Sequence, residues 1–283
     1  MPRSIPWFIG LLCGLLCVPN TSSAQSPSTP AFEVASVKQN KSSGNTRPQF
    51  SVQPGGRVTL TNMPLDALIR MAYQLQPLQL LGGPSWTGSD RFDIVAKSAT
   101  EIRLVPGTIG PLQLMLQSLL VDRFNLKVHT EARELPVYVM AIARTDGTLG
   151  PQLHPSGLDC GDALSGGAQP PAGQRRCGMN ATPGYFSGGG VALSQLALGL
   201  GAILQRVVID RTGLTGHFDF DLTWTPDNFV FGPPPAAAAF PLPDPNAPAM
   251  LTALREQLGL KITSPKEPVD VLVIDTVEHP TDD

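Results

Sequence analysis

The stretch Val207–Thr225, VVIDRTGLTGHFDFDLTWT, decides the fold of this chain. It begins with an apolar run, passes through a turn marked by glycines, and ends where hydrophobic and polar residues alternate. A period of two places alternate side chains on opposite faces of a strand. One face would hold three hydrophobic residues and the other three polar ones: Phe218, Phe220 and Leu222 against Asp219, Asp221 and Thr223. The stretch therefore predicts a strand, a turn and a half-buried second strand.

A similar stretch, GGPSWTGSDRFDIVAKS, occupies residues 82–98, and other segments correspond in the same order. The corresponding segments are 65–72 and 193–200, 116–125 and 250–259, 126–128 and 260–262, and 136–142 and 268–274. Gly259 aligns with Asn125, and both residue types tolerate the left-handed end of a helix. The sequence therefore predicts an α+β fold with two pseudo-repeated halves, 32–144 and 185–283. Each half would pack about two helices on an antiparallel sheet.

The first half shows strand and helix patterns in alternation. Strands are predicted at Phe32–Lys38, Arg57–Thr61 and Arg91–Lys97, and the polar, Gly-rich residues Gln39–Gly56 predict a loop. Apolar residues spaced for a helix follow an Asn-x-Pro sequence, so Asn62 is expected to be the N-cap.

The next two elements are expected to be a helix and a hairpin. The helix should begin at Pro111 and end at Asn125 in the left-handed conformation. Leu126–Thr130 and Pro136–Ala143 are then expected to pair, with the polar cluster Glu131–Glu134 at the hairpin tip.

Two further segments lack periodicity. The connector 145–184 is rich in Gly and Pro and holds Cys160 and Cys177, while residues 229–249 form a Pro/Ala-rich insertion in the second half. An even pair of cysteines in an exported protein favours a disulfide. The alternative, a zinc site, lacks a second close Cys or His pair at metal spacing.

The N-terminus has the pattern of an export signal. Arg3 precedes an apolar run of about 14 residues, Ile5–Val18, which is too short for a relaxed membrane span. Small residues then predict cleavage after Ala24, so residues 1–24 would be a signal peptide and 25–31 a linker. An uncleaved anchor and a lipoprotein modified at Cys17 are the alternatives. The sequence predicts an exported protein, periplasmic or extracellular, with no stable membrane span after cleavage.

Composition narrows the class of partner. The chain has 283 residues, 42% hydrophobic and 15% charged, and a net charge of -3. Lys and Arg are scattered, so the sequence lacks the footprint of a nucleic-acid-binding protein. We therefore expect the partner to be a protein or an envelope component.

The familiar catalytic motifs are absent from the sequence. The chain has four histidines, and none of them forms an HExxH metallopeptidase motif: His129, His154, His217 and His279. The GxSxG motif of hydrolases and the P-loop motif do not occur either. Asp210–Gly213, DRTG, is similar to an aspartic peptidase motif, but the aligned residues Pro84–Thr87 offer no second carboxylate. An Asp-initiated turn is the simpler interpretation.

Two other pairs of residues are candidates for ligand binding. Asp219 and Asp221 share a strand face, but two carboxylates are too few for calcium without further oxygens. Trp86 and Trp224 are candidate platforms, although large apolar side chains beside strands are more often part of a core. We expect no cofactor, no metal site and no catalytic residue.

Several segments together resemble one known family. They are FEVASVK, LDALIRMAY, LLGGPSW, RFDIVAK, LMLQSLLVDRFNLKVHTEARELPVY, VVIDRTGLTGHFDFDLTWTPD and LREQLGLKITSPKEPVDVLVIDTVEHP. These segments look like the soil-associated exported protein family of soil bacteria, whose function is not established. The resemblance implies export and a common fold. Some relatives join this domain to an antibiotic-sensor membrane metallopeptidase, which implies sensing. The helix–strand–strand order also resembles the N-terminal signalling module of secretins and TonB-dependent receptors.

Three functions remain open from the sequence. The favoured one is a non-catalytic binding or interaction protein with a role in envelope sensing or assembly. A hydrolase could assemble a dispersed site from His217, Asp210 and a serine. A structural protein could assemble through sheet edges.

Overall fold

The structure is a computed structural model that describes residues 30–42, 47–102, 109–158, 160, 175–226, 244 and 246–280. The predicted signal peptide 1–24, most of the linker 25–31 and most of the insertion 229–249 lie outside these residues. None of the helices in the described part of the chain is long and apolar enough to cross a membrane.

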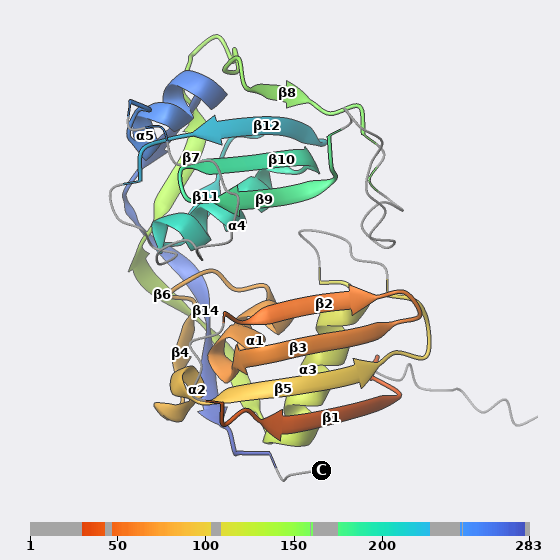
Figure 1. The fold of residues 1–283 in the computed structure, drawn as a ribbon. Coiled ribbons are helices and arrows are strands. Elements are labelled where there is room, and N and C mark those ends of the chain that lie inside the picture. Colours follow the sequence, from red (N-terminus) through yellow and green to blue (C-terminus); the bar gives the residue numbers. More distant parts are fainter. Residues whose placement is uncertain are drawn as a thin grey trace, which may run out of the picture.

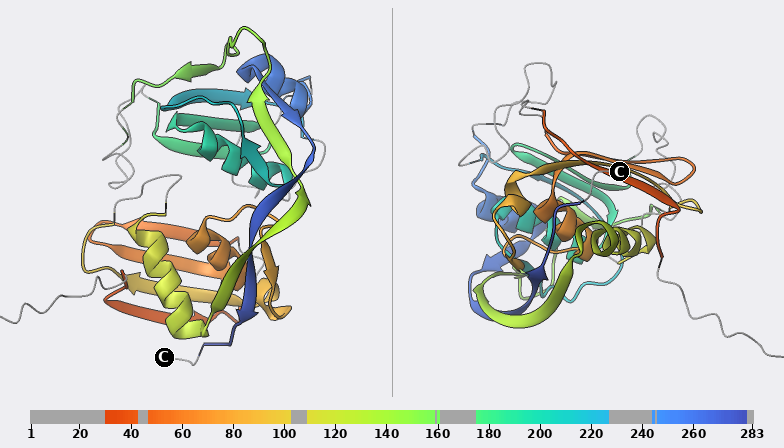
Figure 2. Two further views of the ribbon diagram at one scale, coloured as in Figure 1. Left: turned by 180° about the vertical axis from the view of Figure 1, so that it is seen from behind. Right: turned by 90° about the horizontal axis from the view of Figure 1, so that it is seen from below.

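The fold is α+β, as predicted, with two lobes at the ends of a long β ribbon (Figure 1). Each lobe has a four-stranded antiparallel sheet, with helices against one of its faces (Figure 2). No helix in the described part of the chain covers the other face of either sheet. Each sheet therefore has one uncovered face.

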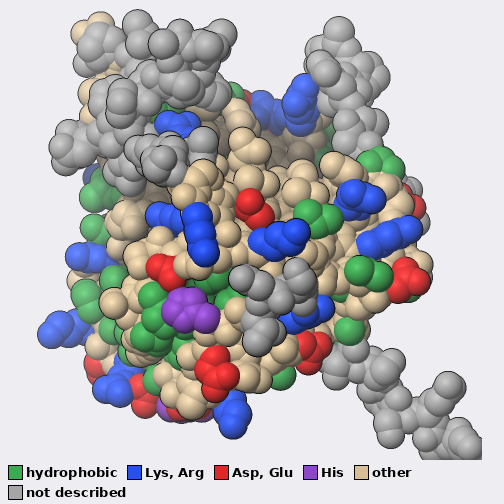
Figure 3. Space-filling model, turned by 60° about the horizontal axis from the view of Figure 1, so that its bottom comes forward, with side chains coloured by type: hydrophobic (Ala, Val, Ile, Leu, Met, Phe, Trp, Pro, Cys, Tyr) green, Lys and Arg blue, Asp and Glu red, His purple; other side chains and the backbone are tan. Residues whose placement is uncertain are grey.

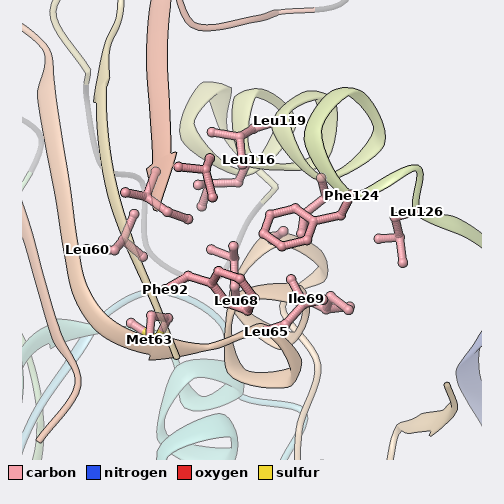
Figure 4. Close-up of a cluster of buried hydrophobic side chains, with 14 of the residues drawn as sticks. Leu60, Met63, Leu65, Leu68, Ile69, Phe92, Leu116, Leu119, Phe124 and Leu126 are labelled. Carbon is pink, nitrogen blue, oxygen red and sulfur yellow. The ribbon is translucent and has the colours of Figure 1, made fainter. Parts of the chain in front are cut away.

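The first lobe has the strand order β1-β5-β3-β2. Its strands are β1 (Val34–Gln39), β2 (Gln49–Gln53), β3 (Arg57–Pro64) and β5 (Arg91–Lys97), and its helices are α1 (Leu65–Tyr73), α2 (Trp86–Ser89) and α3 (Pro111–Phe124). Inward side chains of β3 and β5 meet the apolar stripes of α1 and α3 (Figure 4). Phe92 and Phe124 pack edge to face, with ring centroids 5.2 Å apart.

The second lobe has the strand order β8-β12-β10-β9. Its strands are β8 (Leu153–Pro155), β9 (Gly178–Thr182), β10 (Tyr185–Val191) and β12 (Phe218–Thr223); its helices are α4 (Leu193–Leu204), α5 (Met250–Ala253) and the π-helical η1 (Leu254–Leu258). The alternation predicted for β12 is confirmed, since Phe218, Phe220 and Leu222 are buried. Phe220 packs against Phe186.

The ribbon corrects the predicted hairpin. β6 (Lys127–Pro136) continues past Val137 into β7 (Tyr138–Ile142), and the two do not pair with each other. β6 pairs instead with β14 (Lys266–Thr276), and β7 with β13 (Leu260–Thr263). The prediction failed because the alternation that suits a hairpin suits equally a strand that pairs with the other half of the chain.

Two short parallel strands complete the ribbon. They are β4 (Leu80–Gly82), which pairs with β14, and β11 (Val208–Asp210), which pairs with β7. The predicted hairpin tip Glu131–Glu134 lies within β6, opposite Pro268–Val271 of β14. Each half of the chain therefore completes the sheet of the other.

Three local predictions were also wrong. β2 lies inside the predicted loop Gln39–Gly56, and β8 and β9 lie inside the connector 145–184. Asn62 is not an N-cap; it belongs to β3 and has a φ of 56° at a break in the strand register. The polar composition of β2 and β9 concealed them, because edge strands need few apolar residues.

The strand-to-helix junctions of the two lobes use the same device. At Asn62 the backbone N–H donates to Oδ1 of Asp93 at 2.8 Å. At Gly190, with φ of 63°, the N–H donates to Oδ1 of Asp219, also at 2.8 Å. The predicted left-handed end of α3 at Asn125 is confirmed by its φ of 48°. The internal duplication itself stays a prediction, which superposition of the halves would test.

Candidate functional site

A hollow lies on the uncovered face of the second sheet, and we call it the β10 hollow. One wall comes from residues 175–180, which lead into β9, and the floor from Tyr185, Ser187, Gly188 and Gly189 of β10 and Asp221 of β12. Its volume is about 840 Å³, within the range of small-ligand sites, about 300–1,000 Å³.

A charged network crosses the floor of the hollow. The Asp221 carboxylate forms an ion pair with Arg175 and accepts a hydrogen bond from the Tyr185 hydroxyl at 2.6 Å. Arg175 also donates to the backbone oxygens of Phe220, at 3.0 Å, and Gly188, at 3.3 Å. These bonds fix the guanidinium over the strands, so the network presents charges of defined position.

The pKa of each group in this network is shifted away from neutrality. Burial alone would raise the pKa of Asp221, but hydrogen bonds from Arg175 and Tyr185 outweigh it, so that pKa lies below its usual value. Burial and the bond to Asp221 raise the pKa of Tyr185, and the same carboxylate raises the pKa of Arg175. All three pKa values move away from neutrality, so the charges stay fixed at physiological pH.

A disulfide holds the wall of the hollow against the sheet. Cys160 and Cys177 are bonded, with Cα atoms 5.7 Å apart, which confirms the predicted pairing. The glycines of β10 allow this close approach. A Cβ on Gly189 would lie 2.2 Å from the oxygen of Arg176, and one on Gly190 would lie 2.3 Å from Sγ of Cys160. Larger residues there would push the wall off the strand.

The structure places the other predicted site residues apart. Oδ1 of Asp210 accepts hydrogen bonds from the backbone and hydroxyl of Thr212, at 2.8 and 2.7 Å, which is the geometry of an Asp-initiated turn. The carbonyl of His217 accepts from the backbone of Ser156. The Asp219 carboxylate accepts a hydrogen bond from the backbone N–H of Gly190 in β10, and Asp221 belongs to the charged network of the β10 hollow.

The two tryptophans lie in different surroundings. Trp224 is buried in the core of the second lobe. Trp86 packs partly buried beside the first core and stacks on His279, with ring centroids 3.8 Å apart. The bonded pairs His279–Asp90 and His129–Asp275 are exposed.

The described residues contain no cluster of three or more metal-ligating side chains. Within the same residues, no histidine ring bonds to a serine or cysteine side chain. The β10 hollow offers hydrogen-bond donors and acceptors whose positions are fixed by the network on its floor.

The comparisons with known proteins give a family. Residues 66–277 match the family described as "Protein of unknown function (DUF3738)". The chain belongs to this family. The match runs from α1 to the end of β14, so it covers the ribbon and the second lobe but leaves out β1, β2 and β3 of the first sheet. No curated protein and no solved structure matches the chain. The soil association and the likeness to the secretin module stay predictions.

Sequence reasoning missed most residues of the β10 hollow. Arg175 stands in the segment 145–184 that was predicted to be a connector, and Tyr185 directly follows it; Arg175 meets Asp221 across 46 positions. A local signal did exist. Thr182-Pro183-Gly184-Tyr185 has Pro and Gly at the central positions of a turn, and Gly184 has a φ of 79°. That turn would have predicted the β9–β10 hairpin, though not the charged network.

A second hollow, of about 590 Å³, lies on the other side of the second lobe. Its lining includes the exposed cations Arg144, Arg255 and Lys261 and the exposed Leu251. It has neither a disulfide wall nor a paired carboxylate, so we take the β10 hollow as the candidate functional site.

Proposed function

We propose that this chain is an exported, non-catalytic binding protein that recognises an envelope component or a partner protein through the β10 hollow. The observation that carries the proposal is the fixed network of Asp221, Arg175 and Tyr185 on the floor of that hollow. An acid–base catalyst works best with a pKa near the operating pH. The pKa shifts here go the other way and keep charges constant, which suits recognition.

The framework around the network also favours recognition. The floor is built on three paired strands, and the wall is tied down by the disulfide. A rigid site loses little conformational entropy when a ligand binds. The disulfide is compatible with the predicted export, because such bonds persist in oxidising compartments.

The test is capture of a component from envelope extract by three purified proteins. Ser187→Trp fills the hollow from its floor, at the position directly opposite Asp221 in the strand register. Thr263→Trp puts the same ring on an exposed position of the ribbon and is the matched control. We expect the wild type and the control to retain one component that Ser187→Trp loses. Equal retention by all three proteins would reject the hollow as the site.

A turnover screen separates this function from the hydrolase. Peptide, ester, glycoside and phosphate substrates should give no reproducible turnover. If turnover is found and is lost in Asp210→Ala or His217→Ala, the protein is an enzyme and the proposal is wrong.

A further inference from the structure

The uncovered face of the first sheet carries a group of cations, which we call the basic face. Helices α1 and α3 pack on the opposite side of this sheet (Figures 1 and 2). The inward positions of β1, β3 and β5 are apolar, so the alternate positions face solvent. Four of these outward positions are Lys38, Arg57, Arg91 and Lys97. Figure 3 shows Lys and Arg side chains spread over this part of the surface.

Two cations of the basic face are placed where they repel each other. Arg57 of β3 lies directly opposite Lys97 of β5 in the strand register. Like charges in directly opposed positions of a sheet repel and destabilise the pair. The acidic residue among these outward positions, Asp93, lies opposite Lys38 and bonds to the Asn62 backbone and the Asn40 side chain. Within the described residues, none of the four cations has an ion-pair partner. An external anion would relieve this repulsion.

Apolar side chains lie among the cations. Val95 is 44% exposed and Val34 is 66% exposed, and both are outward residues of adjacent strands. Val34 lies opposite Lys97. No aromatic residue stands at the outward positions of β1, β3 and β5, so the platforms that single-stranded nucleic acids require are missing from this face. Clustered Lys and Arg residues are attracted to the negative surface of anionic lipids, and exposed apolar side chains beside them can contact the lipid interface.

We propose that the basic face binds the surface of membranes that contain anionic phospholipids. The chain as a whole has a net charge of -3, so overall charge would repel such a membrane. Attraction must therefore come from this local group, which acts within about 10 Å, the screening length at 0.1 M salt. The face lies on the other lobe from the β10 hollow, so the two candidate surfaces do not share residues.

The test is cosedimentation of the purified exported protein with vesicles. One set contains phosphatidylcholine alone, and the other contains added phosphatidylglycerol. We expect binding to the anionic set only, and its loss at 1 M salt. Each Lys or Arg near an anionic surface contributes about fivefold to binding, so Arg57→Gln/Lys97→Gln should weaken it about 30-fold.

The matched control is Arg144→Gln/Arg255→Gln, which removes the same charge from exposed positions of the second lobe. It should bind within about twofold of the wild type, and neither variant should have an unfolding midpoint below that of the wild type. Equal weakening by the two variants would overturn the proposal, because net charge would then be the cause. Absence of vesicle binding would also overturn it, as would binding of soluble alginate, an acidic polysaccharide, in place of vesicles.

Discussion

Gly190→Ala is expected to destabilise the protein mainly through the disulfide. Gly190 has a φ of 63°, which costs an Ala residue about 1 kcal/mol. Its new Cβ would lie 2.3 Å from Sγ of Cys160, well inside a normal contact. Displacing the bonded sulfur is an overpacking change, which costs about 2 kcal/mol. The free energy of unfolding should therefore fall by about 3 kcal/mol.

A double-mutant cycle separates these two costs. In a Cys160→Ala/Cys177→Ala background, the nearest remaining atom of residue 160 is Cβ, at an ordinary 3.6 Å. Only the cost of the left-handed backbone then remains, so Gly190→Ala should lose about 1 kcal/mol. Urea unfolding of the four proteins should give a coupling energy of about 2 kcal/mol.

Gly213→Ala is the matched control for this cycle. Gly213 has a φ of 69° and open space around its Cβ position, so it carries the backbone cost alone. It should lose about 1 kcal/mol in either background. If Gly190→Ala costs the same with and without the disulfide, the glycines of β10 do not seat the wall of the hollow, and the reasoning fails.

Three further predictions concern the two lobes and the ribbon. Phe92→Ala removes a fully buried ring from the first core and should lower the free energy of unfolding in urea by about 3–5 kcal/mol. Val95→Ala on the uncovered face should change that free energy by no more than about 0.5 kcal/mol. The lowered pKa of Asp221 means that its contribution to stability is present above about pH 4, the unfolded value, and is lost as the pH falls further. Asp221→Asn should remove that loss and cost about 1 kcal/mol at neutral pH, allowing for solvent screening; an unchanged acid limb of the pH–stability curve would contradict this. Residues 32–144 expressed alone should give no cooperative thermal transition, because β6 and β7 would lack their partner strands; calorimetry tests this.

Elements whose burial pattern is local were predictable from the sequence. Arg91–Lys97 is a strand with the predicted bounds, because three buried apolar residues alternate with four outward residues, of which three are charged. The end of α3 at Asn125 followed from the tolerance of Asn for positive φ. In both cases a few consecutive residues determine the local structure, and the neighbouring elements only provide apolar surface for them to pack against.

Pairing between distant strands was not predictable in the same way. β6 can form the same backbone hydrogen bonds with β14 as it would with a neighbouring β7, since both partners offer the same backbone donors and acceptors. The choice depends on the path of the whole chain, which no local pattern records. The charged network could not be predicted for a related reason, since Arg175 and Asp221 meet only after β9, β10 and β12 have come together.

The two uncovered faces show how one framework can serve two purposes. Asp93 and Asp219 do the same work, because each accepts the backbone N–H of a left-handed residue at a strand-to-helix junction. The residue two positions later differs: Val95 is exposed in the first lobe, whereas Asp221 binds Arg175 and Tyr185 in the second. A structural requirement fixes the aspartate, and the outward position after it is free to change. That freedom allows a flat basic face on one lobe and a walled, polar hollow on the other. Because the ribbon joins the lobes through strands of both halves, a ligand in the hollow and a membrane on the basic face would be held by one body.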